Sequence, residues 1–295
     1  MNILVTGGTG FVGRNLCREL HDRGHDVTAM ARNPEGADLP AGVSTVVGDV
    51  SAYDSIEAAF EGQDAVVNLV ALSPLFKPSG GNEMHDEVHR RGTENCLRAA
   101  EEHGVDRFVQ MSALGADPDG DTAYIRAKGR AEKAVESSGL DWVIFRPSVI
   151  FGDGGEFVSF TKKLAPPFLT PLPGGGKTRF QPIWVGDLVP MLADAVEDDA
   201  HVEKLYEIGG PEKLTLAEVA KLVHRAAGRP ATVVPVPMAL AGVGLSVAGS
   251  IPGFPMGADQ YRSLKFDNTT GDNDVNAFGV EESELTTLAA HLGAK

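Results

Sequence analysis

The feature that most constrains the fold is a run of glycines near the N-terminus, between a short apolar segment and an amphipathic one. Residues 3–6 read Ile-Leu-Val-Thr, and residues 7–13 read Gly-Gly-Thr-Gly-Phe-Val-Gly. Glycines spaced in this way permit a tight turn, close approach of the backbone to a pyrophosphate, and close packing of helix on strand. The N–H groups that open the following helix then face the phosphates. The sequence therefore predicts a dinucleotide-binding turn made of Thr6, Gly7, Thr9, Gly10, Phe11, Val12 and Gly13.

Short apolar runs alternate with amphipathic segments through the first half of the chain. Apolar runs without strict alternation are typical of parallel strands covered on both faces, and we expect strands at 3–6, 26–31, 44–47, 65–70, 107–111 and 142–146. Apolar residues at helical spacing predict helices at 11–23, 55–60, 86–102, 122–138, 187–196 and 215–227. Alternating strands and helices predict an α/β fold built on a doubly wound parallel sheet.

The second half of the chain changes character. Prolines and glycines at 166–176 and 235–255 predict loops between shorter elements. We expect residues 1–152 to form the dinucleotide-binding core. Residues 153–295 are expected to complete the sheet and to form a small C-terminal substrate cap, within one integrated unit.

The end of the second predicted strand indicates which dinucleotide binds. An acidic residue about twenty positions after the glycines holds the ribose 2′-OH of NAD, whereas an arginine pairs with the 2′-phosphate of NADP. The strand ends Met-Ala-Arg, with Arg32 at that position. Arg32 therefore favours NADP(H), while NAD(H) remains the alternative.

These motifs resemble the short-chain dehydrogenase/reductase superfamily, whose extended and atypical members begin with T-G-x-x-G-x-x-G. Gly48-Asp49-Val50 is similar to the third-strand motif of that family, in which the Asp accepts from the adenine amine. Blocks at 111–117, 145–152, 172–176 and 181–185 resemble the branch that contains the 39-kDa accessory subunit of respiratory complex I and its free-standing prokaryotic relatives. The resemblance implies further cofactor contacts from Asp49, Val50, Leu69, Val70, Ala71, Pro147, Ser148 and Val149.

A strand-end serine and a Tyr-x-x-x-Lys pair complete the resemblance. Tyr124 and Lys128 lie one helical turn apart, and a cation near a phenol lowers the pKa of the phenol. The resemblance implies a catalytic set in which Tyr124 exchanges a proton, Lys128 also holds the nicotinamide ribose, and Ser112 bonds the substrate oxygen. His89 stands where the family usually has an Asn that serves a proton relay. Only eleven residues separate Ser112 from Tyr124, which argues against a nucleotide-sugar substrate.

The charge balance limits the classes of partner. The chain contains 26 Lys and Arg and 41 Asp and Glu, which gives a net charge of −15. This charge disfavours nucleic acid and anionic lipid heads as binding partners. It is also typical of proteins from salt-loving cells. Two cysteines far apart, Cys17 and Cys96, and an N-terminus without a signal peptide indicate a reduced, cytoplasmic setting. We expect no metal site, because His85 and His89 lack the Glu of the zinc-protease motif.

The apolar stretch at 233–258 is interrupted by prolines, so we interpret it as a buried or substrate-facing helix rather than a membrane span, with peripheral membrane contact as the alternative. Together with Phe157, Phe160, Phe168 and Leu169, it indicates a hydrophobic small-molecule substrate. The leading hypothesis is hydride transfer between NADP(H) and a carbonyl or hydroxyl of such a molecule. The alternatives are a non-catalytic NADPH-holding scaffold or assembly factor of a respiratory-type complex, and a nucleotide-sugar epimerase or dehydratase. The sequence leaves the substrate, the reaction direction and the oligomeric state open.

Overall fold

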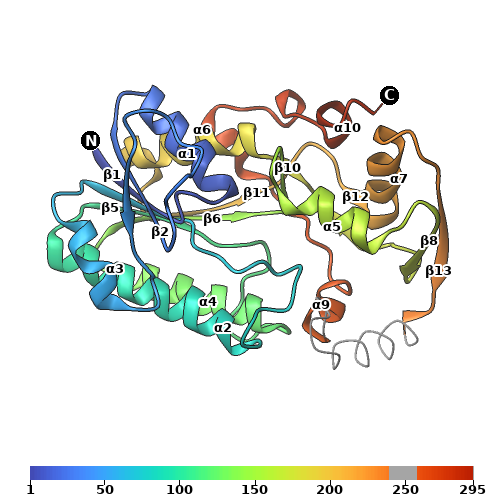
Figure 1. The fold of residues 1–295 in the computed structure, drawn as a ribbon, viewed down its shortest axis with the longest axis horizontal. Coiled ribbons are helices and arrows are strands. Elements are labelled where there is room, and N and C mark those ends of the chain that lie inside the picture. Colours follow the sequence, from blue (N-terminus) through green and yellow to red (C-terminus); the bar gives the residue numbers. More distant parts are fainter. Residues whose placement is uncertain (239–257, 295) are drawn as a thin grey trace. The chain divides into compact units, whose positions relative to one another are not determined.

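The computed structural model describes residues 1–238 and 258–294, and its centre is a seven-stranded sheet (Figure 1). The strand order is β11-β6-β5-β4-β1-β2-β3, and the pairs from β3 to β6 are parallel. The order reverses at β1, as in doubly wound folds. The strands are β1 (Asn2–Thr6), β2 (Asp26–Ala31), β3 (Ser44–Val47), β4 (Ala65–Asn68), β5 (Arg107–Met111), β6 (Asp141–Pro147) and β11 (Lys204–Ile208).

Helices cover both faces of this sheet. Figure 1 shows α1 (Phe11–Asp22) and α6 (Val185–Glu197) on one face, and α3 (Gly92–His103) and α4 (Ala123–Glu136) on the other. Every residue of β4 and β5 is buried as a result, which explains why their sequences are apolar without a period of two. The predicted doubly wound α/β fold is confirmed.

The chain groups into two compact units. The first contains residues 1–72, 82–146 and 185–206, and the second contains 73–81, 147–184 and the described part of 207–295. The second unit holds three helices that pack small apolar clusters, α5 (Glu156–Leu164), α7 (Leu216–Ala226) and α10 (Leu288–His291), together with α9 (Ala258–Ser263). Its strands are β7 (Ile150–Phe151), β8 (Phe168–Pro173), β9 (Arg179–Phe180), β10 (Ile183–Trp184), β12 (Leu214–Thr215) and β13 (Ala231–Val236).

Four sequence predictions of secondary structure were wrong. The helix expected at 55–60 is a pair of 3₁₀ turns, Tyr53–Ser55 and Glu57–Phe60, because Ile56 between them has a φ of −116°, which does not continue one helix. The helix expected at 86–102 begins with a short turn at Glu83–His85 and a π-helical turn at Asp86–Arg91 before α3. The proline-rich loop expected at 166–176 contains β8, in which Pro171 and Pro173 lie on an open edge. The strand β11 had no predicted range, although residues 153–295 were expected to complete the sheet.

The apolar stretch at 233–258 lies mostly outside the described residues, and its first residues belong to β13 rather than to a helix. Within residues 1–238 and 258–294, no helix is both long and apolar enough to cross a bilayer. The same residues contain no cluster of three or more His, Cys, Asp or Glu that could hold a metal ion.

Candidate functional site

The glycine turn closes tightly over the carboxyl ends of β1 and β2. The N–H groups of Gly7 and Gly8 donate to the Met30 carbonyl, at 2.8 and 3.2 Å, and Gly7 has a φ of +75° that suits only glycine. A Cβ on Gly13 would lie 2.2 Å from the Gly7 carbonyl oxygen, so α1 can approach the turn only without a side chain there. These contacts reproduce the packing roles expected of the glycines.

The first turn of α1 is left open to a ligand. Its N-cap is Gly10, no side chain caps it, and it contains no acidic residue. The first N–H groups of a helix have no partner within the helix, so those of Phe11, Val12 and Gly13 are available to an anion. This uncapped N-terminus fits the pyrophosphate of a dinucleotide.

The residues predicted to hold the adenosine end lie just after β2 and after β3. Arg32 is exposed and makes no ion pair within the described residues, although the chain carries many carboxylates. Asp49 accepts from the Ser51 N–H and hydroxyl through Oδ1, which fixes its carboxylate at the mouth of the turn. Val50 is buried in the core and its carbonyl accepts from Asn95, so it supports this segment from beneath.

A buried row of polar side chains crosses the sheet beside the glycine turn. Thr6, Asn68 and Gln110 occupy the same register position on β1, β4 and β5. The Thr6 hydroxyl donates to Asn68 Oδ1 at 2.6 Å, and Asn68 Nδ2 donates to Gln110 Oε1 at 2.9 Å. Gln110 Nε2 then donates to the Met111 carbonyl, which also accepts from Lys128 Nζ at 2.8 Å. The row thus connects the dinucleotide turn to Lys128 through hydrogen bonds.

Three residues one helical turn apart line the inner face of α4: Tyr124, Lys128 and Glu132. The Ser112 hydroxyl donates to Glu132 Oε1. Arg146 holds the same carboxylate with two hydrogen bonds, at 2.9 and 2.6 Å. Glu132 was not among the predicted site residues, although its position four residues after Lys128 was a usable signal. The structure brings Ser112 next to Glu132 and Arg146, and its hydroxyl proton is already used in that contact.

Two imidazole rings flank the ring of Tyr124. His85 and His89 lie edge-on to it, with centroid distances of 5.6 and 5.2 Å. Burial raises the pKa of the Tyr124 phenol, contrary to the lowering expected from a neighbouring cation. The reason is geometric, since Lys128 Nζ lies 6.0 Å from the Tyr124 ring centroid and donates to the Met111 carbonyl instead. Burial lowers the pKa of Lys128 to about 8.

His89 ties the π-helical turn to the segment that follows β4. Its Nε2 accepts from the Leu72 N–H at 2.9 Å, so the ring is neutral with its proton on Nδ1, which has no hydrogen-bond partner within the described residues. A Cβ on Gly7 would meet the backbone of Leu69 and Val70 at 3.2–3.3 Å, so these residues pack against the glycine turn. Ala71, the next residue, is exposed. His89 therefore anchors the stretch predicted to line the cofactor cleft.

The predicted nicotinamide contacts Ser148 and Val149 fall in the second unit with Pro147. Ser148 Oγ lies 2.7 Å from Asn268 Oδ1, which also accepts from the Val149 N–H at 3.0 Å. Of the residues predicted to contact a hydrophobic substrate, Phe157 and Phe160 are buried and serve packing. Phe168 and Leu169 are exposed on β8.

The fold and the glycine turn define a Rossmann-type dinucleotide-binding protein. Residues 7–166 match the NAD(P)H-binding family, and the chain belongs to that family. It is 32% identical over 75% of its length to the mitochondrial NADH dehydrogenase (ubiquinone) 1 alpha subcomplex subunit 9 of Arabidopsis thaliana, so the expected likeness to the complex I subunit is confirmed.

Two enzymes show a similar identity. The chain is 30% identical over 77% of its length to an NAD(P)H azoreductase of Xenophilus azovorans, covering 74% of that protein. It is 30% identical over 81% of its length to the chloroplastic divinyl chlorophyllide a 8-vinyl-reductase of Cucumis sativus. The chain spans 56% of the Arabidopsis protein and 60% of the Cucumis protein.

Solved structures confirm the architecture over nearly the whole chain. A nucleoside-diphosphate-sugar epimerase of Staphylococcus aureus superposes with a TM-score of 0.75 at 19% identity, covering 99% of both chains. UDP-glucose 4-epimerase of Thermus thermophilus, solved with NAD, gives 0.68 at 24% identity, covering 92% of this chain and 95% of that one. At these identities the likeness concerns the fold.

Proposed function

We propose that this chain is an NADP(H)-dependent oxidoreductase that transfers hydride between the dinucleotide and a hydrophobic small molecule. The observation that carries the proposal is the uncapped N-terminus of α1, joined by the Thr6–Asn68–Gln110 row to the Tyr124 and Lys128 face of α4. A phosphate-binding turn connected to a proton-exchanging pair is the arrangement that hydride transfer requires. Named relatives that reduce azo and vinyl groups support an acceptor of low polarity.

The predicted site residues have separate roles in cofactor binding and proton transfer. The N–H groups of Phe11, Val12 and Gly13 bind the pyrophosphate, Asp49 accepts from the adenine amine, and Arg32 pairs with the 2′-phosphate. The bound nicotinamide supplies or accepts the hydride. Tyr124 gives a proton to the substrate oxygen as the hydride reaches the adjacent carbon, and Lys128 holds the ribose. Ser112 reaches the substrate oxygen only if its hydroxyl leaves Glu132, because a hydroxyl carries a single proton.

Cofactor choice is tested by calorimetry on nucleotide-free protein with NADPH and NADH. Loss of a charge-assisted pair to phosphate weakens binding by about 1.5–3 kcal/mol. Arg32→Glu is therefore expected to lower NADPH affinity more than tenfold while leaving NADH affinity nearly unchanged. Arg18→Glu, an exposed arginine on α1, is the matched control. Equal affinity of the native protein for NADPH and NADH would contradict the assignment of Arg32 to the 2′-phosphate.

The proton donor is tested with Tyr124→Phe, using NADPH with quinones and azo dyes as acceptors. General acid catalysis contributes roughly 10²–10⁴-fold in rate. The variant is expected to lose that factor in turnover and to keep NADPH affinity. Turnover equal to the native rate would refute the mechanism.

A second candidate function is a scaffold that holds NADPH without consuming it. The donation of Ser112 to Glu132 and the raised pKa of Tyr124 favour it, and so does the likeness to a complex I subunit. The scaffold predicts tight NADPH binding, slow exchange of the nucleotide, and no oxidation of NADPH with any acceptor. Turnover that Tyr124→Phe abolishes would exclude it.

A further inference from the structure

One end of the second unit is built from two segments that carry cations and no carboxylate. Residues 162–173 and 219–238 contain five Lys and Arg, and neither segment contains any Asp or Glu. Acidic residues outnumber basic ones 41 to 26 in the whole chain, so a stretch of this length without a carboxylate is unusual for it. The five cations are Lys162, Lys163, Lys221, Arg225 and Arg229.

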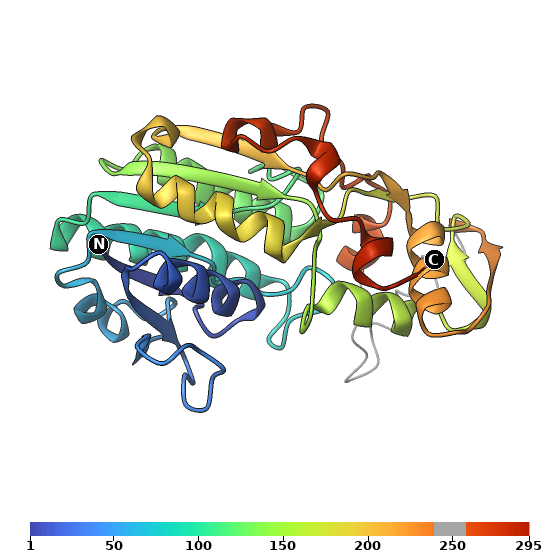
Figure 2. The ribbon, with the colours of Figure 1, turned by 90° about the horizontal axis from the view of Figure 1, so that it is seen from above.

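The fold places these two segments side by side. β8 pairs in parallel with β13 from the Phe168–Ala231 pair to the Pro173–Val236 pair. The two strands lie against α7 in both views of the molecule (Figures 1 and 2). His224 on α7 also bonds the Ala165 carbonyl at 2.5 Å. The strand pair, the end of α5 and the end of α7 thus form one surface, which we call the β8–β13 end.

The outer face of this strand pair is apolar. Thr170 and Leu172 point inward and are fully buried, while Leu169 is 68% exposed and Val234 is 41% exposed. Pro171, which pairs with Val234, is also exposed. Three apolar residues therefore lie together in water on the face away from α7.

A strained backbone adds an aromatic ring to that face. Phe168 has a φ of +70°, in the left-handed region that disfavours a bulky side chain, and it is 63% exposed. This conformation breaks the alternation of the strand, so that Phe168 and Leu169 both face water. Among the described residues, no close packing of the exposed ring offsets this strain, and such strain concentrates at functional sites.

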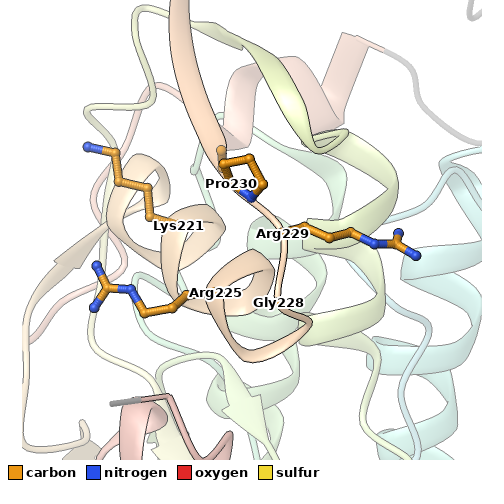
Figure 3. A pocket seen from close by; sticks show the side chains of 6 residues that line it. Lys221, Arg225, Gly228, Arg229 and Pro230 are labelled. Atoms are coloured by element: carbon orange, nitrogen blue, oxygen red, sulfur yellow. The ribbon is translucent and has the colours of Figure 1, made fainter.

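The cations at this end are exposed, and none makes a direct ion pair within residues 1–238 and 258–294. Lys163 Nζ lies over the Phe76 ring, 5.5 Å from its centroid, and Lys221 lies near the Glu218 carboxylate. A surface hollow is lined by Lys221, Arg225, Gly228, Arg229, Pro230 and Ala231. Figure 3 shows Lys221 and Arg225 extending from one side of α7 and Arg229 extending the opposite way. Cations that diverge in this way do not converge on a single small anion, but they can each meet a separate charge on an extended surface.

The open edge of β8 excludes pairing with an added protein strand. The N–H groups of Phe168 and Gly174 donate to β13 and its flank, so alternation places positions 169, 171 and 173 on the open edge. The Leu169 N–H donates to the Pro167 carbonyl, and the other two residues are prolines. This edge has no N–H donor for a partner strand.

We propose that the β8–β13 end binds the surface of an anionic lipid bilayer, with Phe168, Leu169 and Val234 entering the interface and the five cations meeting lipid phosphates. Exposed apolar residues flanked by Lys and Arg are the composition that interfacial binding requires. The net charge of −15 does not oppose it, because charges more than about 8 Å away are largely screened at physiological ionic strength. The surface is independent of the dinucleotide site.

The test is co-sedimentation of the full chain with vesicles of phosphatidylcholine, or of equal parts phosphatidylcholine and phosphatidylglycerol. We expect binding to the mixed vesicles alone, weakened by molar salt. Each cation near an anionic surface contributes about fivefold in partition coefficient. Lys221→Gln with Arg225→Gln is thus expected to lower binding about 25-fold. Lys133→Gln, an exposed lysine on α4, is the matched control.

The apolar contribution is tested with Leu169→Ser against Val47→Ser, because Val47 is similarly exposed on β3. Phe168→Gly separates binding from folding, since glycine adopts φ +70° without strain. It is expected to keep or raise Tm and to weaken vesicle binding several-fold.

Absence of binding to either vesicle, equal binding to both, or binding that these variants leave intact would overturn the proposal. Capture by polyglutamate without vesicle binding would assign the surface to an acidic protein instead.

Discussion

Lys128 is the residue whose environment departs furthest from that of an ordinary surface lysine. It is 1% exposed, and Glu132 and the Met111 carbonyl are the groups that favour its charge. Burial outweighs them and lowers its pKa from 10.5 to about 8. At neutral pH the chain therefore keeps a desolvated ammonium group buried at the carboxyl end of β5.

This burial predicts how stability changes with pH. The folded protein releases the Lys128 proton near pH 8 and the unfolded chain near 10.5, so unfolding takes up a proton between these values. Lys128 alone should raise the free energy of unfolding by up to about 1.4 kcal/mol per pH unit from pH 8 to 9.5. The thiols of Cys17 and Cys96 oppose this rise, because burial raises the pKa of each to about 12 and only the unfolded chain loses their protons in this range. In urea titrations the native profile should therefore rise relative to that of Lys128→Met, and Lys133→Met should follow the native profile. Identical profiles for the native protein and Lys128→Met would contradict the buried charge.

At the residue scale the sequence revealed what depends on local spacing. Tyr124 and Lys128 lie one turn apart on a helix, and their i, i+4 separation was sufficient to place them together. The partner of Ser112 depends on the approach of α4 to β5, which no local pattern encodes, and Glu132 was missed for that reason. The row formed by Thr6, Asn68 and Gln110 depends on sheet register in the same way.

At the scale of elements, one glycine controls how closely α4 approaches the loop after β5. A Cβ on Gly129 would lie 2.3 Å from the Asp117 carbonyl carbon and 2.4 Å from the Pro118 nitrogen, and backbone atoms cannot move aside cheaply. Gly→Ala within a helix ordinarily stabilises by about 1 kcal/mol. Gly129→Ala should instead destabilise by about 2–3 kcal/mol through overpacking. Thermal unfolding checks this, with Gly139→Ala, which has no close contact, as the control.

The π-helical turn carries a second titrating group. Burial, with the charges of Lys128 and His85 nearby, holds the pKa of His89 well below 6.5. Below pH 6.5 the His89 imidazole becomes protonated in the unfolded chain but stays neutral in the folded protein. The free energy of unfolding therefore falls as the pH drops, by up to about 1.4 kcal/mol per pH unit. His89→Asn should flatten the profile between pH 6.5 and 5 in denaturant titrations. A slope that survives in the variant would assign the loss to other groups.

Elements with strong local signals were predicted, and elements fixed by distant contacts were not. The strands β1, β2, β3 and β5 were predicted almost to the residue, because each is an apolar run between turns. The π-helical turn at Asp86–Arg91 is tied to a distant segment by the bond from the Leu72 N–H to His89, and β8 pairs with a strand 63 residues later in the chain. β11 joins β6 at the sheet edge, where its alternating exposure gave a weaker apolar signal.

At the scale of the whole molecule, the cations are concentrated in a few places. Arg23 binds Glu19, Asp194 and Glu197, and Arg90 binds Asp86 and Glu94. Within the part of the chain that the structure describes, the five cations of the β8–β13 end take no part in such pairs. Many carboxylates elsewhere are therefore left to repel one another.

This excess of carboxylates predicts the response to salt. Salt screens the repulsion among like charges, and it also weakens ion pairs. Exposed pairs contribute only about 0–1 kcal/mol each, whereas a net charge of −15 acts on the whole folded chain. Relief of repulsion should therefore dominate, and each 1 kcal/mol gained should raise Tm by about 2–4 °C.

Scanning calorimetry from low to molar sodium chloride measures that response. Most of the rise should occur below a few tenths molar, where the Debye length falls under about 8 Å. A rise confined to higher concentrations would instead point to ion exclusion from the surface, which sulfate produces more strongly than chloride. A Tm that is flat or falls with added chloride would mean that the ion pairs of Arg23 and Arg90 outweigh the repulsion.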